Sequence, residues 1–126
     1  MIAAIHLRAE AGESAAQFQA RAGDALRTLA ARPGFRNGSL ARAVDDESDW
    51  LLLTEWESVG AYRRALGNYQ VKLLATPVLA GAEDRPSAFE PLLTIGPDGS
   101  EQVRASDRAA GIEPAGYQTG RPGSVN

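Results

Sequence analysis

The chain contains no cysteine, and its 126 residues include a single histidine, His6. The missing thiols exclude disulfides, thiolate nucleophiles, iron–sulfur clusters and cysteine-based zinc sites. One imidazole is too few for a histidine-rich metal centre, and it permits a Ser-His-Asp triad only at His6. No G-x-G-x-x-G sequence and no Walker sequence occurs, so no nucleotide-binding fingerprint is present. We therefore predict that any chemistry proceeds without a metal or a cofactor.

Basic residues and long apolar runs are also scarce. Lys and Arg number 13 against 16 Asp and Glu, which gives a formal net charge of −3. Because this charge repels phosphate, nucleic acid is not an expected partner. No apolar run approaches the roughly 20 residues of a membrane-spanning helix, and the N-terminal segment becomes polar at His6, too early for a signal peptide. We predict a cytoplasmic protein without a membrane partner.

The composition changes near residue 95. Residues 96–126 hold six glycines and three prolines, close to the roughly 25–30% at which disorder or an extended arm is expected. The sequence Gly96-Pro97-Asp98-Gly99 predicts a turn, and 101–104 predicts a short extended segment after it. We therefore predict one folded domain over residues 1–95 and a flexible or partner-wrapping tail over residues 96–126.

The first half of the folded domain predicts a strand, a helix and a strand. Residues 2–9 alternate with a period of two, which is typical of a strand. Ser14-x-x-Gln17 is a capping box that begins a helix, and Pro33-Gly34 ends it. The apolar stripe of this helix comprises Phe18, Ala22, Ala25, Leu26 and Leu29. Residues 35–44 predict the second strand.

The second half repeats this order. Residues 50–56 alternate as a strand; one face carries Trp50, Leu52, Thr54 and Trp56. Ser58 caps a helix that ends near Gly67, with Val59, Tyr62 and Leu66 on one stripe. A short helical turn over 69–75 and a last strand over 87–95 follow. The order β-α-β-β-α-β predicts an α+β, ferredoxin-like unit.

A four-stranded sheet of this kind is covered by helices on one face only. We expect Leu40, Leu51 and Leu53 on the other face, where an exposed row of leucines would promote aggregation. The simplest solution is a homodimer in which two sheets pack together as a dimeric α+β barrel.

Three motifs in residues 1–95 resemble the antibiotic biosynthesis monooxygenase superfamily of dimeric α+β barrels. They are Pro33-Gly34-Phe35, then Trp56-Glu57-Ser58 with Ala61-Tyr62-Arg63, and finally Pro86-Ser87-x-Phe89-Glu90. The resemblance implies a cofactor-independent monooxygenase that uses O₂ to oxidise a small aromatic substrate, a polyketide anthrone or a quinol, to a quinone. The haem-degrading branch needs a histidine ligand on the second helical segment, and this chain has none there.

Trp56 and Tyr62 are the predicted catalytic residues, at positions where the resemblance places a pocket tryptophan and an active-site tyrosine. An indole donates one hydrogen bond and stacks on flat aromatic rings. A phenol with a pKa of about 10 donates to a developing phenolate or peroxide. For both residues the alternative is a structural role in the core.

Five further residues are predicted to line the substrate pocket: Leu52, Thr54, Leu66, Tyr69 and Lys72. Leu52 stands where the related oxygenases carry a polar residue, and Lys72 matches their basic residue only loosely. These departures motivate an alternative function, a non-catalytic dimeric protein that binds a small molecule or a partner. His6 shares a face with Ile2 and Ala4, so we expect it in the dimer interface rather than as a catalytic base. The acidic run 45–49 is expected to be a solvated turn.

Overall fold

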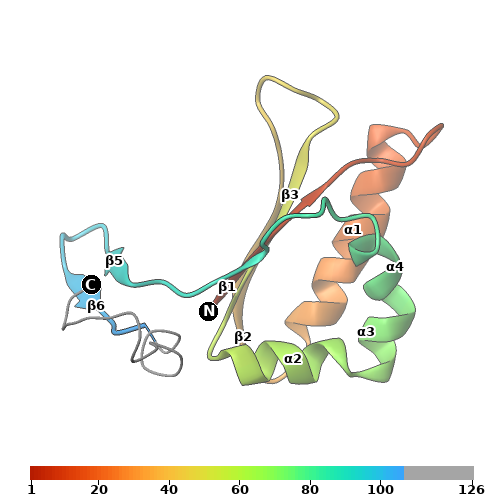
Figure 1. The fold of residues 1–126 in the computed structure, drawn as a ribbon. Helices are drawn as coiled ribbons and strands as arrows, with labels where there is room; N and C mark the ends of the chain where they lie inside the picture. The colour runs from red at the N-terminus through yellow and green to blue at the C-terminus, as the bar shows by residue number, and fades with distance from the viewer. Residues whose placement is uncertain (107–126) are drawn as a thin grey trace, which may run out of the picture. The chain divides into compact units, whose positions relative to one another are not determined.

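An antiparallel sheet with the strand order β2-β3-β1-β4 lies at the centre of the first of two structural units. The computed structural model describes residues 1–106, with the first unit running from Met1 to Phe89 and the second beginning at Glu90. The sheet strands are β1 (Ile2–Leu7), β2 (Phe35–Arg42), β3 (Trp50–Trp56) and β4 (Ala88–Phe89). The helices of this unit cover one face of the sheet (Figure 1). This is the predicted α+β, ferredoxin-like fold.

The helices are α1 (Ala15–Ala30), α2 (Val59–Leu66), α3 (Tyr69–Leu74) and α4 (Thr76–Leu79). The predicted capping box begins α1: the Gln17 amide donates to Ser14 Oγ at 3.1 Å, and the Ser14 amide donates to Gln17 Oε1 at 2.8 Å. These bonds satisfy amides that the first turn of a helix leaves without partners. None of the helices in residues 1–106 is long and apolar enough to span a bilayer.

The inner face of the sheet is set by the register of β1 and β3. Ala3 pairs with Thr54, Ile5 with Leu52, and Leu7 with Trp50. Directly paired residues of antiparallel strands point to the same face, and all six of these side chains are buried. The alternation predicted for both strands is confirmed, and it puts the core between the sheet and the helices.

The prediction for Leu40 is wrong. Leu40 pairs with Leu52 and packs against the core on the helix side. The reason is a register shift in β2 between Phe35 and Asn37, a β-bulge that inserts one extra residue. Because side chains alternate with a period of two, one extra residue exchanges the two faces for the rest of the strand. Leu51 and Leu53 do point to the outer face, as predicted.

The outer face of the sheet is partly apolar. Ile2, Ala4 and Leu51 are half-buried, and Leu53 is 36% exposed. His6 pairs with Leu51 on this face, so its predicted orientation away from the core is confirmed.

The predicted last strand is divided into two. β4 pairs with β1, whereas β5 (Leu93–Ile95) pairs with β6 (Glu101–Val103) as a hairpin of the second unit. Pro91 lies between the two segments and has no amide hydrogen to donate to a sheet. The predicted turn is confirmed, since the Gly99 amide donates to the Gly96 carbonyl oxygen at 2.9 Å. Residues 107–126 of the predicted tail lie outside the described residues.

Candidate functional site

Three aromatic side chains meet at the end of β3. The ring centroids of Phe35 and Trp56 are 5.3 Å apart in an edge-to-face arrangement, and those of Trp56 and Tyr62 are 5.5 Å apart. Both spacings lie in the range of favourable aromatic pairs, each worth about 0.5–1.5 kcal/mol beyond burial. We call Phe35, Trp56 and Tyr62 the aromatic cluster. It contains both predicted catalytic residues, so the structure brings these two together.

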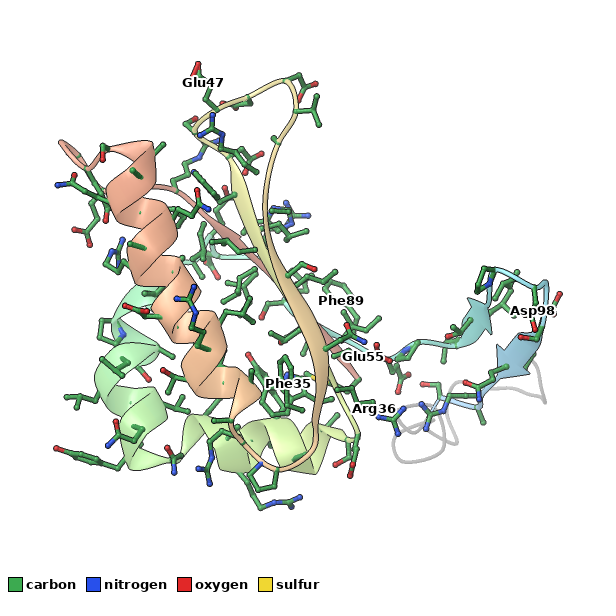
Figure 2. The ribbon with its side chains drawn as sticks, turned by 180° about the vertical axis from the view of Figure 1, so that it is seen from behind. Phe35, Arg36, Glu47, Glu55, Phe89 and Asp98 are labelled. Atoms are coloured by element: carbon green, nitrogen blue, oxygen red, sulfur yellow. The ribbon has the colours of Figure 1, made fainter. Side chains whose placement is uncertain are left out.

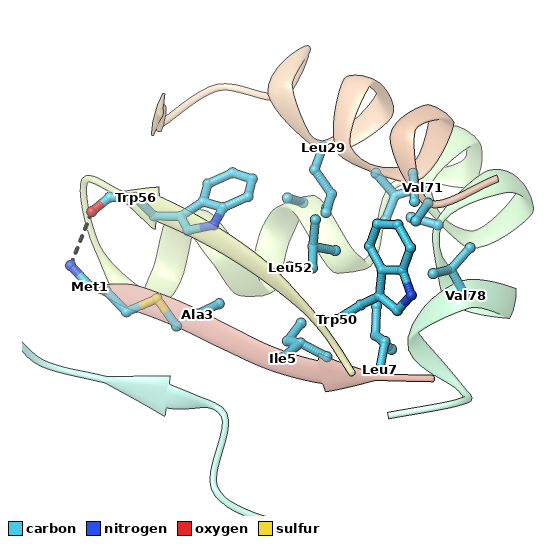
Figure 3. Close-up of a cluster of buried hydrophobic side chains, with 14 of the residues drawn as sticks. Met1, Ala3, Ile5, Leu7, Leu29, Trp50, Leu52, Trp56, Val71 and Val78 are labelled. Atoms are coloured by element: carbon cyan, nitrogen blue, oxygen red, sulfur yellow. Dashed lines mark hydrogen bonds between the residues drawn. The ribbon is translucent and has the colours of Figure 1, made fainter. Parts of the chain in front are cut away.

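Backbone hydrogen bonds hold Trp56 in place. Its amide donates to the Met1 carbonyl oxygen at 2.8 Å, and the Met1 amino nitrogen donates to the Trp56 carbonyl oxygen at 3.1 Å (Figure 3). Ser58 Oγ then accepts the Ala61 amide at 3.0 Å and caps α2. Tyr62 follows in the first turn of this helix, and its amide donates to the Ser58 carbonyl oxygen. The short connection between β3 and α2 therefore places the phenol ring against the indole.

Phe35 joins the cluster because β2 begins very close to α2. Gly34 has φ +89°, and the Glu57 amide donates to its carbonyl oxygen at 2.8 Å. A β-carbon on Gly34 would lie 2.5 Å from the Ala61 β-carbon. Only glycine fits this conformation without strain or overlap. The Pro33-Gly34-Phe35 motif thus acts at the site by bringing Phe35 to Trp56, a contact that sequence reasoning missed.

The contact with Gly34 also determines which residues of α2 are buried, and they differ from the predicted stripe. Ala61 and Ala65 are buried, Tyr62 and Leu66 are half-buried, and Val59 is exposed. The predicted stripe through Val59 is therefore wrong at that position, because the close approach of Gly34 turns the alanine side of α2 toward the core. Tyr62 lies at the edge of this buried side, between the core and the solvent.

The indole of Trp56 is hydrogen-bonded within the chain. Its Nε1 donates to Thr54 Oγ1 at 2.9 Å, and both residues are only 1% exposed. The two side chains are two positions apart on β3, so they share the inner face. Sequence reasoning placed Thr54 in the pocket but missed this bond, although the shared face was a signal for it.

Tyr62 combines partial burial with a free hydroxyl group. Within residues 1–106 its hydroxyl group makes no hydrogen bond, and burial raises the pKa of the phenol above its ordinary value. The phenol is therefore protonated at neutral pH and available as a donor to a ligand.

The other predicted pocket residues divide into two groups. Leu52 is buried beside Thr54 on the inner face, and Leu66 packs against the core. Tyr69 is 70% exposed on α3, and Lys72 is exposed on the same helix. The structure therefore brings Leu52, Thr54 and Leu66 into the core region of the cluster, but it leaves Tyr69 and Lys72 at the surface.

The second tryptophan lies in a different environment. Figure 3 shows Trp50 apart from Trp56 on the inner face, with Leu52 between them. The ring centroids of Phe18 and Trp50 are 5.0 Å apart, and the Arg42 guanidinium carbon lies 5.3 Å from the Trp50 ring centroid. Phe18 and a cation thus both contact this indole, so its neighbours differ from those of Trp56.

The acidic run 45–49 lies far along the same hairpin. In Figure 2, Phe35 lies at one end of the β2–β3 hairpin and Glu47 lies at the tip of its connecting loop. The loop residues 44–48 are mostly exposed, as predicted for a solvated turn.

Comparison with known proteins identifies the fold. The crystal structure of SnoaB, a cofactor-independent oxygenase from Streptomyces nogalater, has a TM-score of 0.56 at 21% identity, over 72% of this chain and 93% of that chain. Rv0793 from Mycobacterium tuberculosis has a TM-score of 0.55 at 20% identity, over 72% and 94% of the two chains. A conserved protein from Methanosarcina mazei has a TM-score of 0.55 at 11% identity, over 69% and 84%.

No curated protein matches the sequence. The family described as antibiotic biosynthesis monooxygenase matches residues 1–74, which is more than half of the chain and includes β1 to β3, α2 and the whole aromatic cluster. The chain therefore belongs to the antibiotic biosynthesis monooxygenase family.

Proposed function

We propose that this protein is a cofactor-independent monooxygenase, which oxidises a small aromatic substrate of the anthrone or quinol type with O₂ to a quinone. Family membership and the shared fold with SnoaB, itself a cofactor-independent oxygenase, support this activity. The aromatic cluster supports an aromatic substrate, because flat rings pack favourably on an aromatic ring such as that of the half-buried Tyr62.

One observation carries the proposal: a free phenol lies directly against a buried indole. Tyr62 is protonated at neutral pH, its hydroxyl group has no partner within residues 1–106, and its ring centroid is 5.5 Å from that of Trp56. A donor at the edge of an apolar site stabilises an oxyanion more strongly than the same donor does in water.

The proposed reaction is balanced without any other reductant. An anthrone loses a methylene proton to solvent, and the resulting carbanion transfers one electron to O₂. The radical pair combines to a peroxide, which collapses to the quinone. One oxygen atom becomes the new carbonyl, and the other leaves as water with the two methylene hydrogens. The protein contributes positioning and stabilisation of charge.

Within this scheme Tyr62 donates a hydrogen bond to the phenolate or peroxide oxygen. Trp56 is buried behind the Tyr62 ring and keeps that side of the donor apolar, as does the buried Leu52 in the core, and Leu66 is half-buried on the same helix as Tyr62. These side chains lower the local polarity, which favours electron transfer from a poorly hydrated carbanion to neutral O₂. Tyr69 and Lys72 complete the predicted pocket only if a substrate reaches the surface of α3.

An O₂ electrode tests the proposal with anthrone and with a hydroquinone as substrates. We expect O₂ uptake with one quinone formed per O₂ from anthrone, and a loss of about a hundredfold in kcat for Tyr62→Phe. Trp56→Phe should also lower kcat, whereas Trp50→Phe removes an indole outside the cluster and serves as its matched control. Uptake equal in Tyr62→Phe and the parent protein would remove Tyr62 from the mechanism.

A non-catalytic binding protein of the same fold is the second candidate. The engaged indole N–H and the nearly complete burial of Trp56 favour it, because a filled core leaves the ring only a structural task. A rise in melting temperature with anthrone, without any O₂ uptake, would support binding alone.

The proposal includes a homodimer in the cytoplasm. The outer sheet face carries Ile2, Ala4, Leu51 and Leu53, and a second copy of this face would remove these side chains from water. The absence of cysteine agrees with a reducing compartment.

A further inference from the structure

The β5–β6 hairpin of the second unit has one apolar face, and this face is exposed. The two strands pair in the register Leu93 with Val103 and Ile95 with Glu101. Because directly paired residues point to the same face, Leu93, Ile95 and Val103 lie together, with Glu101 beside them at the turn. All three apolar side chains are more than half exposed. The hairpin therefore presents an aliphatic surface to water.

Backbone hydrogen bonds alone do not make such a hairpin stable. Each strand has three residues. At the turn the Gly96 amide donates to the Ser100 carbonyl oxygen at 2.8 Å, and at the base the Arg104 amide donates to the Leu92 carbonyl oxygen at 3.0 Å. An isolated two-stranded hairpin is only marginally stable in water unless its apolar face packs against another element. We therefore expect another surface to cover this face.

The first unit contains a second apolar surface without a cover, the outer face of its sheet. This face carries Ile2, Ala4, Leu51 and Leu53. Phe89 pairs with Ile2 and so lies on the same face, where it is exposed. Since Phe89 is the last residue of β4 and β5 begins four residues later, the outer face and the apolar hairpin are joined by a short linker.

The linker favours the outer face of a second copy over that of the same chain. β4 runs antiparallel to β1 and ends beside Ile2, the first residue of β1, so the chain leaves the sheet at its end. Glu90 precedes a proline and is therefore restricted to extended conformations, and Pro91 has a fixed φ. No backbone hydrogen bond closes a turn between Glu90 and Leu93. Covering its own sheet would require the hairpin to reverse direction at these residues, whereas a second copy requires no reversal.

We propose that the apolar face of the hairpin packs on the outer sheet face of a second copy, at the edge of the sheet-to-sheet contact. Each protomer of the homodimer then holds its partner with the hairpin. The inference rests on the homodimer of the proposed function, and it adds a contact that the two sheet faces alone do not supply. Glu101, at the turn end of the hairpin, stays at the rim of this contact, where charged groups remain hydrated.

Sedimentation velocity of the full chain over a range of concentrations measures the Kd of the dimer. The double variant Leu93→Thr with Val103→Thr makes the apolar face polar but keeps side chains that favour strands. Because both residues are exposed in the single chain, the cost falls on the dimer, and we expect a Kd at least about tenfold weaker. Thr94→Gln with Gln102→Thr exchanges the paired residues of the opposite face and should leave the Kd unchanged.

A single nitroxide label shows which chain the hairpin contacts. The parent protein has no cysteine, so Thr94→Cys provides one labelling site on the face opposite to the apolar one. The labelled protein is mixed with a parent protein that is enriched in nitrogen-15. Faster relaxation of the Leu51 and Leu53 amides in the unlabelled partner would support the proposal. Faster relaxation that occurs only when label and isotope are on the same chain would overturn it.

The outcomes separate the hairpin from the dimer and from the proposed activity. If Leu53→Glu dissociates the dimer but the Leu93 and Val103 double variant does not, the homodimer stands and the hairpin contact is refuted. A monomeric parent protein refutes it as well. O₂ uptake with anthrone is measured on the same samples: uptake without a hairpin contact leaves the proposed activity intact, whereas a confirmed contact without uptake removes the activity alone.

Discussion

Gly34 and Ala61 approach so closely that a β-carbon on Gly34 would lie 2.5 Å from the Ala61 β-carbon. The same glycine has φ +89°. This contact joins the start of β2 to α2 and so brings Phe35, Trp56 and Tyr62 into one cluster. The close approach of the Gly34 backbone to the Ala61 methyl group therefore determines the geometry of the candidate site.

Gly34→Ala should destabilise the protein more than Gly12→Ala does. Both glycines have positive φ, which costs an alanine roughly 1–2 kcal/mol. A β-carbon on Gly12 would meet nothing within 4 Å beyond its chain neighbours, whereas one on Gly34 would meet Ala61. We expect a further loss of about 1–3 kcal/mol for Gly34→Ala, as is typical of overpacking. Urea denaturation measures the free energy of unfolding of both variants. Equal losses would show that the structure around Ala61 makes room for the new methyl group without cost.

The Glu13 carboxylate should make stability depend on pH in the acid range. Arg21 donates to both oxygens of Glu13, at 2.9 and 3.1 Å, and this holds the pKa of the carboxyl group below its ordinary value. A lowered folded-state pKa contributes stability above the unfolded pKa of about 4.3 and loses it as the pH falls through the folded value.

Glu13→Gln should therefore remove part of the loss of unfolding free energy on acidification, because the side chain no longer titrates. Urea denaturation over a series of acidic pH values measures the difference from the parent protein. Glu47→Gln, at the exposed tip of the β2–β3 loop, is the control. The same acid dependence in parent and Glu13→Gln proteins would contradict the expectation.

Tyr62 should titrate at a higher pH than an exposed tyrosine. Burial raises the pKa of its phenol above the ordinary value, so ionisation of the folded protein is delayed to above about 10. The raised pKa of Tyr62 therefore contributes stability to the folded protein. This stability is fully present below the pKa of tyrosine in the unfolded state, and it is lost as the pH rises through the pKa of Tyr62 in the folded state.

Ultraviolet difference absorbance of the phenolate measures the titration. The parent protein should show one tyrosine that ionises last, and Tyr62→Phe should lack this component. Oxygen uptake that depends on the Tyr62 proton should persist up to the same pH and then fall. A last-ionising component still present in Tyr62→Phe would assign it to another tyrosine.

Leu53→Glu should separate a homodimer into monomers. Leu53 lies on the outer face of the sheet and is 36% exposed in the single chain. A buried, unpaired carboxylate in a sheet-to-sheet interface is strongly unfavourable. Leu73→Glu makes the same change at a leucine of α3 that is 53% exposed, and it should leave the assembly unchanged. Sedimentation velocity measures both, and a monomeric parent protein would refute the dimer.

Much of the fold was predictable because it depends on local patterns. The capping box at Ser14, the alternation in β1 and β3, and the turn at Gly96 each involve neighbouring residues, whose periodicity and hydrogen-bonding chemistry are visible in the sequence. The order of these elements was then enough to indicate the ferredoxin-like unit. The Trp56 and Tyr62 positions followed from a family resemblance rather than from periodicity.

The features that were not predictable depend on contacts between distant segments. The face of Leu40 depends on a bulge that only the pairing of β2 with β3 reveals, and the buried side of α2 depends on how closely Gly34 meets Ala61. The partner of the Trp56 indole likewise depends on its side-chain rotamer in the packed core.

The sequence by itself determined which segments become helices and strands, and it excluded thiol chemistry and a histidine cluster. Tertiary structure alone decided which polar groups find partners within residues 1–106: the Trp56 indole N–H has one in Thr54, whereas the Tyr62 hydroxyl group has none. The physical reason is that hydrogen-bond satisfaction is a property of the whole packed core, whereas periodicity and capping act over a few neighbouring residues.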